Sequence, residues 1–428
     1  MKLSVVGSGY VGTTIAACFA ELGHDVTAID IDESVVDSLN QGTAAIHEPG
    51  LDDLLAEHVG DRLRATTDYS TIPETDATFL ALPTPSNDDG SIDTAIILAA
   101  AESVGQALAE KSEPHLVVTK STVTPGTTET QIASTVREAA GGNEAIQFGM
   151  NPEFLREGSA VEDFLNPAKI VLGTASDGAA ETLRAIFEPL VDRTEAPVIE
   201  TGIREAEMIK YANNAFLATK ISLINELGNI CKEHEIDAYE IADAIGLDDR
   251  IGEQFLRSGV GWGGSCFPKD VAAIIAAARQ QGYEPELLSA AVGVNDRQPR
   301  RMVELLAGHV DLDGKRIAVL GLAFKPGTDD IRNSRAIPLI DALLDRGASV
   351  VAYDPVAAEN MREQYPDIDY ADSAAGALSE ADGALVVTDW PEFAALDEAF
   401  DAMSTPVVVD GRRVIERREG LVYEGLTW

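Results

Sequence analysis

The residues of this chain with the clearest chemical potential lie in one glycine-rich segment, Gly259–Asp270, which contains Cys266. Four glycines precede the cysteine, and Pro268 and Lys269 follow it before a helical pattern begins at Val271. Proline suits the first turn of a helix. A helix N-terminus and a neighbouring cation both favour the thiolate, the nucleophilic form of cysteine. The segment therefore predicts a reactive thiol with the Asp270 carboxylate nearby, whereas a free cysteine in a flexible loop would need neither the glycines nor the charges.

A second motif opens the chain. The run Gly7-Ser8-Gly9-Tyr10-Val11-Gly12 follows a strand pattern at Leu3–Val6 and precedes a helical pattern at Thr14–Leu22. Glycines in this setting let the backbone approach a pyrophosphate at a helix N-terminus. Asp30 lies 18 residues after Gly12, at the end of the next strand pattern. A carboxylate there binds ribose hydroxyls and repels a 2′-phosphate. Glycines alone would also suit a tight turn, but together with Asp30 they predict NAD rather than NADP.

A long helical pattern from about Ile203 to Lys232 carries Lys210 and Asn214, four residues apart and therefore on one face. The pattern is apolar nearly all round, which predicts a largely buried helix. A buried lysine is costly unless it meets an anion. Lys210 is therefore a candidate binding residue, with a lysine reaching towards solvent or a structural ion pair as the alternatives.

Strand and helix patterns alternate at both ends of the chain, while helices dominate the middle. Alternation of this kind is typical of doubly wound parallel sheets. We predict an α/β protein with two Rossmann-like parallel-sheet domains, residues 1–200 and 311–428, flanking an all-helical domain, residues 201–310. The expected strands are Leu3–Val6, Asp25–Ile29, Ala77–Leu82, Leu116–Thr119, Ile146–Gly149, Arg316–Gly321, Ser349–Tyr353, Ala384–Val387 and Val407–Val409.

The two ends also resemble each other. Gly23–Asp30 aligns with Gly347–Asp354, and each segment has the pattern of a helix end, a strand and a terminal acid. The second domain opens at Gly321 without the further glycines of the first motif. We therefore expect it to bind something other than a second NAD.

The charge of the chain is far from balanced. Among 428 residues, Lys and Arg total 32 and Asp and Glu total 72, a net charge of −40. Such a charge argues against nucleic-acid binding, and its dispersed acids predict a halophilic source, because salt screens their repulsion. An acidic protein from an ordinary organism is the alternative.

Neither a membrane span nor a secretory signal is predicted. The longest apolar stretch, Val271–Ala278, is far shorter than the roughly 20 residues of a spanning helix. The chain starts almost directly in a strand pattern, which leads us to expect a cytoplasmic protein. The cysteines Cys18, Cys231 and Cys266 are too few and too scattered for a disulfide framework or a metal site, so we expect no metal.

Gly263–Asp270, together with Gly7–Gly12, resembles the UDP-glucose 6-dehydrogenase family, one of the nucleotide-sugar dehydrogenases. The resemblance extends over essentially the whole chain. Its further motifs are Pro83–Pro85, Lys120–Thr122, Asn151–Gly158, Lys210 with Asn214, and Gly321–Asp330.

The resemblance implies a four-electron oxidation of a sugar C6 alcohol to a carboxylate with two NAD, which here means UDP-glucose to UDP-glucuronate. Cys266 would attack the intermediate aldehyde, giving a thiohemiacetal and then a thioester. Asp270 and Thr122 would handle the first proton through a water, and Glu153 would assist thioester hydrolysis. Lys210, with Asn214, would steady the developing alkoxide.

The resemblance also implies binding residues and a homodimer joined through the central helix. Arg250 would reach the sugar site of the neighbouring subunit, and Lys325 would face the pyrophosphate. For the cofactor the implied residues are Gly7, Gly9, Tyr10, Val11, Gly12, Asp30, Thr84, Thr122, Glu157 and Lys269. For the nucleotide sugar they are Phe154, Leu155, Lys210, Asn214, Arg250, Gly263, Lys325 and Arg412.

Three residues depart from the family's pattern: Trp262 stands for a usual Phe, Arg335 for Pro and Ser34 for Lys. The first two should be tolerated in packing, and Ser34 removes a possible cofactor contact. Enzymes of GDP-mannose share the chemistry, although Trp262 and Phe267 favour UDP-glucose. UDP-N-acetylhexosamine enzymes typically carry His where this chain has Ser265. A non-catalytic scaffold would not need Cys266.

Overall fold

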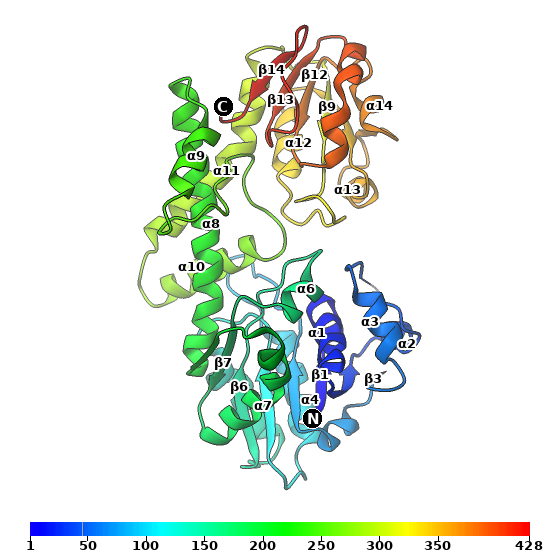
Figure 1. Cartoon of the computed structure of the whole chain (residues 1–428), viewed down its shortest axis with the longest axis vertical. Helices are drawn as coiled ribbons and strands as arrows, with labels where there is room; N and C mark the ends of the chain where they lie inside the picture. Colours follow the sequence, from blue (N-terminus) through cyan, green and yellow to red (C-terminus); the bar gives the residue numbers. More distant parts are fainter. Residues whose placement is uncertain (45) are drawn as a thin grey trace. The chain divides into compact units, whose positions relative to one another are not determined.

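The computed structural model describes residues 1–44 and 46–428, which form two compact units, Met1–Asn213 and Asn214–Trp428. Each unit contains one sheet with helices around it (Figure 1). The prediction of two parallel-sheet α/β regions with helices between them is confirmed.

The first unit is built on an eight-stranded sheet in the order β3-β2-β1-β4-β5-β6-β7-β8. All neighbouring strands are parallel except β6 and β7, which pair antiparallel. The strands are β1 (Lys2–Val6), β2 (Asp25–Ile29), β3 (Leu63–Thr66), β4 (Ala77–Leu80), β5 (His115–Thr119), β6 (Ile146–Met150), β7 (Ile170–Thr174) and β8 (Val198–Thr201). The helices are α1 (Tyr10–Glu21), α2 (Glu33–Asn40), α3 (Leu51–His58), α4 (Ala95–Ala107), α5 (Ala133–Ala139), α6 (Ala160–Leu165) and α7 (Asp177–Thr194), with short turns η1 (Tyr69–Glu74) and η2 (Thr128–Ile132).

Both faces of this sheet are buried. Successive residues of β1 point to opposite sides, so that Leu3 and Val5 join one apolar cluster and Val6 joins another. Helices α1, α3, α6 and α7 contribute to the first cluster, and α4 and α5 to the second. At the centre of the first cluster, the Phe19 ring lies 4.9 Å from Phe79 and 5.3 Å from Phe164. The strands are apolar because helices cover both faces of the sheet.

The second unit has a six-stranded, fully parallel sheet in the order β11-β10-β9-β12-β13-β14. Its strands are β9 (Arg316–Leu320), β10 (Ser349–Tyr353), β11 (Asp369–Tyr370), β12 (Gly383–Val386), β13 (Val407–Asp410) and β14 (Val422–Gly425). The helices of the middle region are α8 (Ile203–Glu233), α9 (Ala238–Gly246), α10 (Phe267–Gln280) and α11 (Glu286–Ala307). Those of the sheet region are α12 (Ala336–Leu344), α13 (Ala358–Gln364) and α14 (Ala374–Leu378), with η3 (Pro391–Ala395) and η4 (Asp397–Ala402).

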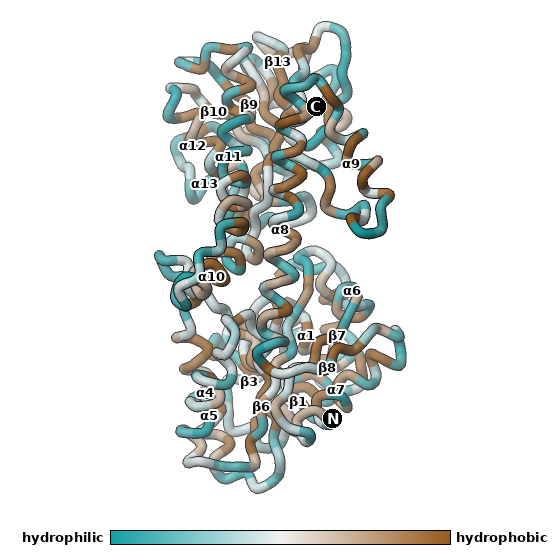
Figure 2. Tube along the Cα trace, turned by 90° about the vertical axis from the view of Figure 1, so that its left-hand side faces the viewer, coloured by the Kyte–Doolittle hydropathy of each residue, from teal (hydrophilic) through white to brown (hydrophobic). Residues whose placement is uncertain are grey.

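The prediction that the long helix α8 is largely buried is wrong for the single chain. Phe216 is 71% exposed and Leu223 is 55% exposed, and Leu227 and Ile230 are exposed as well. These residues follow one another at intervals of seven, four and three, which places them on one face. Hydrophobic stretches along α8 and α9 are visible in Figure 2. The apolar pattern of a helix does not show whether a face is covered by the same chain or by another molecule.

No helix in the described residues, 1–44 and 46–428, is long and apolar enough to cross a membrane.

Candidate active site

The glycine loop after β1 is shaped by close backbone contacts. Gly7 has φ +93°, and a Cβ at Gly12 would lie 1.7 Å from the Gly7 carbonyl oxygen. Neither position therefore accepts a larger residue without a shift of the backbone. By contrast, a Cβ at Gly9 would meet nothing within 4 Å, so Gly9 faces open space at the start of α1.

This loop fits NAD. The Ser8 amide donates to Asp30 at 2.6 Å, which holds the carboxylate beside the loop. The buried Ser8 hydroxyl has no partner among residues 1–44 and 46–428, so it remains available to a ligand. The open side at Gly9, the helix N-terminus and the carboxylate are the features that a dinucleotide needs.

Two substitutions should separate these roles. We expect Gly12→Ala to destabilise the fold by about 3 kcal/mol, because the new Cβ would overlap the Gly7 carbonyl. We expect Gly9→Ala to leave the unfolding free energy within about 1 kcal/mol of the parent while raising the KM for NAD about tenfold or more. Denaturant unfolding and NAD titrations measure both quantities. Equal losses of stability in the two variants would contradict this assignment.

A second cluster of polar groups is buried at the end of β6 and on α8. Lys210 Nζ donates to Glu153 Oε1 at 2.7 Å, and both side chains are buried. The other Glu153 oxygen accepts from the Leu155 amide at 2.7 Å. Burial alone would raise the pKa of Glu153, but the charge and hydrogen bond of Lys210 outweigh it and hold the pKa below its ordinary value. Of the alternatives for Lys210, the structure shows the ion pair, with Glu153 as its anion.

Lys120 is a further buried lysine to which the sequence assigned no role. Its Nζ donates to Asn151 Oδ1 at 2.6 Å, and Asn151 Nδ2 donates to the Val171 carbonyl at 2.8 Å. Burial lowers the pKa of Lys120 to about 7, against the opposing effect of Glu153. The position of Lys120 in the sequence could have indicated a buried polar contact, because a lysine at the end of an apolar strand requires a partner.

The titration of Lys120 should make stability depend on pH. In the unfolded chain a lysine has a pKa of about 10.4, so between about pH 7 and 10 unfolding takes up a proton at this site. The unfolding free energy should therefore rise with pH across this window by up to about 1.4 kcal/mol per unit, relative to Lys120→Met.

Chemical denaturation at several pH values, with the exposed Lys2→Met as control, measures the difference. A difference between parent and Lys120→Met that does not change with pH would show that Lys120 does not titrate in this range.

Hydrogen bonds connect the segments of the first unit that are predicted to bind the cofactor and the substrate. Thr84 Oγ1 donates to the Thr122 carbonyl at 3.0 Å, which joins two residues predicted to bind NAD. The Tyr10 hydroxyl donates to Glu48, and Glu48 accepts from the Gly158 amide at 2.8 Å, next to Glu157. The aromatic ring of Phe154 lies 5.6 Å from Lys210 Nζ. Glu48 was not predicted, because its partners lie far from it in the sequence.

In the second unit, Cys266 is the N-cap residue of α10 and is exposed. The helix begins at Phe267 rather than at Val271 as expected, since Pro268 already occupies its first turn. Ser265 Oγ lies 3.6 Å from the Cys266 sulfur. The predicted thiol therefore stands at a helix N-terminus, where the helix dipole favours an anion.

One helical turn beyond the thiol, Asp270 is buried between two donors. Asn214 Nδ2 donates to Asp270 Oδ2 at 2.6 Å, and Lys269 Nζ donates to Oδ1 at 2.7 Å. Lys269, which was expected to act beside Cys266, is thus paired with Asp270. Lys210 and Asn214 are four residues apart on α8, and each binds the carboxylate of its own unit, Glu153 in the first and Asp270 in the second.

The glycines before Cys266 are required by the backbone that packs against them. A Cβ at Gly263 would lie 2.1 Å from the Asn333 carbonyl oxygen, and one at Gly264 would lie 2.8 Å from the Phe324 ring. The Gly264 amide donates to the Arg332 carbonyl at 2.9 Å. Lys325 Nζ lies 5.6 Å from the Phe324 ring. These contacts place the predicted nucleotide-binding lysine on the segment that packs against the thiol loop.

The second sheet repeats the geometry of the first, but its acid is used internally. Gly321 has φ +93°, like Gly7, and Asp354 stands after β10 where Asp30 stands after β2. Asp354 is buried and accepts from the Leu322 amide at 2.7 Å and from Trp390 Nε1 at 2.9 Å. This carboxylate is not available to a ribose, which gives a physical reason for the expectation that a second NAD does not bind here.

The side chain of Arg250 is bonded to Asp248 and not to another predicted site residue within the described residues. Its guanidinium pairs with Asp248 at 2.6 Å and is otherwise exposed. The loop that follows is held by Lys220 Nζ, which donates to the Ile251 carbonyl at 2.9 Å.

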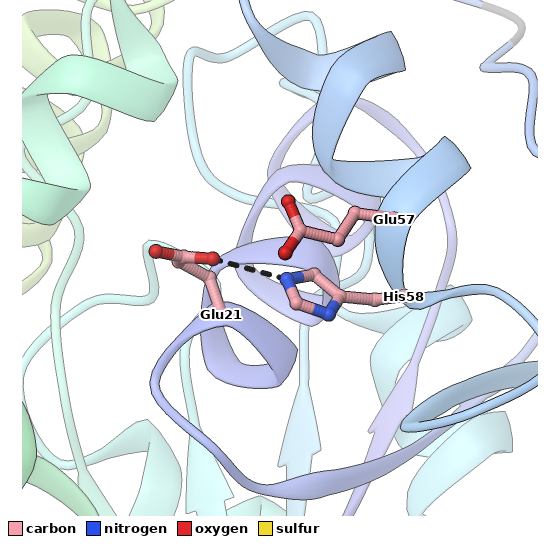
Figure 3. A group of neighbouring side chains, drawn as sticks. All are labelled: Glu21, Glu57 and His58. Atoms are coloured by element: carbon pink, nitrogen blue, oxygen red, sulfur yellow. Dashed lines mark hydrogen bonds and ion pairs between the residues drawn. The ribbon is translucent and has the colours of Figure 1, made fainter.

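The described residues contain one group with metal-ligand types, Glu21, Glu57 and His58 (Figure 3). His58 Nε2 and Glu21 Oε2 are 3.0 Å apart, and Arg193 Nη1 donates to the other Glu21 oxygen at 3.2 Å. An arginine bound to Glu21 disfavours a cation here. We interpret the group as a polar contact that joins α1, α3 and α7.

Three domain models of one family match the chain in order. The NAD-binding domain of the UDP-glucose/GDP-mannose dehydrogenase family matches residues 1–191, its central domain matches residues 204–297 and its UDP-binding domain matches residues 318–417.

Individual relatives agree with these matches. UDP-glucose 6-dehydrogenase AglM of Haloferax volcanii is 67% identical over 100% of both chains, which also supports the predicted halophilic source. The solved UDP-glucose dehydrogenase of Pyrobaculum islandicum is 43% identical with a TM-score of 0.94 and covers 100% of this chain and 98% of its own. A GDP-mannose dehydrogenase of Pseudomonas aeruginosa is 31% identical over 100% of both chains, with a TM-score of 0.57. The protein therefore belongs to the UDP-glucose/GDP-mannose dehydrogenase family of NAD-dependent oxidoreductases.

Proposed function

We propose that this protein oxidises UDP-glucose to UDP-glucuronate and reduces two NAD per sugar. The observation that carries the proposal is the exposed Cys266 at the N-terminus of α10, one turn from the buried Asp270. Oxidation of an alcohol to an aldehyde needs no thiol. A thiol that adds to the aldehyde gives a tetrahedral species that can lose a second hydride.

The proposed sequence begins at the C6 hydroxyl. Asp270 and Thr122 take its proton through a water, while Lys210 and Asn214 stabilise the developing alkoxide. NAD, when bound, accepts the hydride in each of the two oxidations. Cys266 then adds to the aldehyde carbon to form a thiohemiacetal, and loss of the second hydride and a proton leaves a thioester. Glu153, which Lys210 keeps ionised despite burial, assists water in cleaving the carbon–sulfur bond to give the uronate and the free thiol.

We further propose that the three predicted segments have different roles in binding and catalysis. Residues 1–200 bind NAD through Gly7–Gly12, Asp30, Thr84 and Glu157, and residues 201–310 carry the thiol loop. Residues 311–428 bind the UDP end through Lys325 and Arg412. Phe154, Leu155 and Gly263 contact the sugar. The cytoplasm is the proposed compartment, because Cys266 must remain reduced to act.

The test is the number of NADH formed per sugar nucleotide, measured in molar KCl with UDP-glucose and GDP-mannose in parallel. Two NADH per UDP-glucose, with GDP-mannose inert, is the expected result. One NADH or none would show that the Cys266 step is wrong. Turnover with GDP-mannose alone would retain the chemistry and replace the substrate.

We also propose a homodimer formed through α8. The exposed apolar face of α8 (Phe216, Leu223, Leu227 and Ile230) would be covered by the same face of a second copy, because apolar area of this kind is stabilised by removal from water. Arg250 lies next to the loop that Lys220 anchors from this helix.

Leu223→Glu should shift the protein to a monomer in light scattering. The matched change Leu344→Glu, at an exposed apolar residue of α12, should leave the dimer intact. A monomeric parent protein would rule out the proposed dimer.

A further inference from the structure

Two arginines lie along the glycine segment that precedes Cys266. The Cδ atom of Arg335 lies 3.4 Å from where a Cβ of Gly261 would stand, and Nη1 of Arg412 lies 3.7 Å from the corresponding position at Gly259. Arg335 directly precedes α12, and Arg412 follows β13, so both side chains come from connections of the second sheet. Residues far apart in the sequence thus bring two guanidinium groups to one glycine segment.

The charge of Arg335 is poorly compensated. Its side chain is 11% exposed, while its acidic neighbour Asp296 is 65% exposed and 3.6 Å away between Nη1 and Oδ1. Nη2 donates to the Asn333 carbonyl at the long distance of 3.4 Å. The buried Nε has no acceptor anywhere in the described ranges, 1–44 and 46–428. A buried guanidinium with unused donors is costly unless an anion joins it.

Arg412 adds to this cost rather than reducing it. Its Nε donates to the Val387 carbonyl at 2.7 Å, a neutral acceptor. Burial lowers the pKa of Arg335, and the charge of Arg412 lowers it further, while Asp296 opposes the shift. In a protein with a net charge of −40, a buried arginine that has a long contact with one exposed acid and a second arginine nearby indicates a site for an anion.

We propose that Arg335 binds the diphosphate of the nucleotide sugar as a second guanidinium beside Arg412. The planar fork of arginine matches two phosphate oxygens, and a dianion relieves the repulsion between the cations. The proposal rests on the proposed function, because it needs a diphosphate substrate. Lys325 and Arg412 were expected to serve this end of the substrate, whereas Arg335 was expected only to pack.

A contact between Arg335 and the diphosphate predicts which ligands should lose affinity when Arg335 is changed. UDP and UDP-glucose should both use Arg335, and GDP should use it too if GDP binds at all, because the base and the sugar are not involved. UMP has one phosphate fewer and should lose less when Arg335 is changed. The affinity for NAD should not depend on Arg335.

The experiment is calorimetric titration of UDP and UMP into the full-length parent, Arg335→Gln, Arg335→Lys and Arg362→Gln. Arg362 lies on α13, where it pairs with Glu359, and its substitution changes the net charge equally. We expect Arg335→Gln to weaken UDP binding about 10- to 100-fold, the range of a charge-assisted hydrogen bond, and to raise the KM for UDP-glucose more than it lowers kcat. Arg335→Lys should lose less, and Arg362→Gln should bind UDP like the parent.

Three results would overturn the proposal. If UDP binds Arg335→Gln as tightly as the parent, Arg335 only packs against Gly261, and the proposed function still stands. If UDP and UMP weaken equally, the contact is not with the second phosphate. If the parent binds neither UDP nor GDP, the proposed function fails and the assignment of Arg335 fails with it. A thermal unfolding scan of each variant separates loss of folding from loss of binding.

Discussion

Replacing Cys266 with serine is expected to abolish sustained turnover, with a loss on the order of 10⁴-fold or more, as for other enzymes that lose a covalent nucleophile. The serine hydroxyl occupies the same N-cap position but is a far weaker nucleophile than a thiolate. The aldehyde should therefore accumulate at the first stage, with no more than one NADH per chain. Rapid-quench measurement of NADH and intact-mass spectrometry of the quenched protein measure both consequences.

The parent protein should show the added mass of a UDP-glucuronyl group on Cys266 during turnover, and Cys266→Ser should show none. Cys231→Ala is the matched control, because Cys231 is also a free cysteine and lies at the far end of α8. It should turn over like the parent. Two NADH per sugar in Cys266→Ser would refute the thiol mechanism.

The second large effect is expected at Lys210. Lys210→Met would leave the Glu153 carboxylate buried without its partner, and breaking a buried ion pair costs about 3–5 kcal/mol of stability. It would also remove the cation proposed to stabilise the alkoxide, with a loss in kcat of about 10²- to 10³-fold. Denaturant unfolding and steady-state kinetics measure these two losses independently.

A double variant separates them. Adding Glu153→Gln to Lys210→Met removes the unpaired carboxylate and should restore most of the stability but none of the activity. Lys169→Met is the matched control, since Lys169 Nζ lies 4.0 Å from the same Phe154 ring and donates to Asn213 Oδ1 at 3.0 Å. Recovery of activity in the double variant would show that Lys210 serves only to neutralise Glu153 and that Glu153 does not assist hydrolysis.

The sequence predicted the elements whose patterns are local. The strands from Leu3 and Arg316 were recognisable because they are apolar and followed by glycine. Cys266 and Asp270 are four residues apart, which is the spacing of one helical turn. The short strands β3 and β8 were missed because Arg64 and Glu200 interrupt their apolar patterns, and β8 is only partly buried.

What the sequence could not supply was the identity of distant partners. It required an anion for Lys210 but could not select Glu153, which lies 57 residues away. It assigned Arg335 to packing because nothing nearby in the chain shows that Arg412 approaches the same glycine-rich segment. The exposed face of α8 was also hidden, because residue types do not distinguish a surface covered by the same chain from one left to another molecule.

The internal use of Asp354 has a kinetic consequence. Within the described residues, the glycine loop with an open side and an available acid occurs once, at Gly7–Gly12 and Asp30. The proposed reaction reduces two NAD, so at a single dinucleotide site NADH must be exchanged for NAD between the two oxidations. On this proposal the sugar stays bound during the exchange, and a protein diluted during turnover should release NADH well before it releases any partly oxidised sugar.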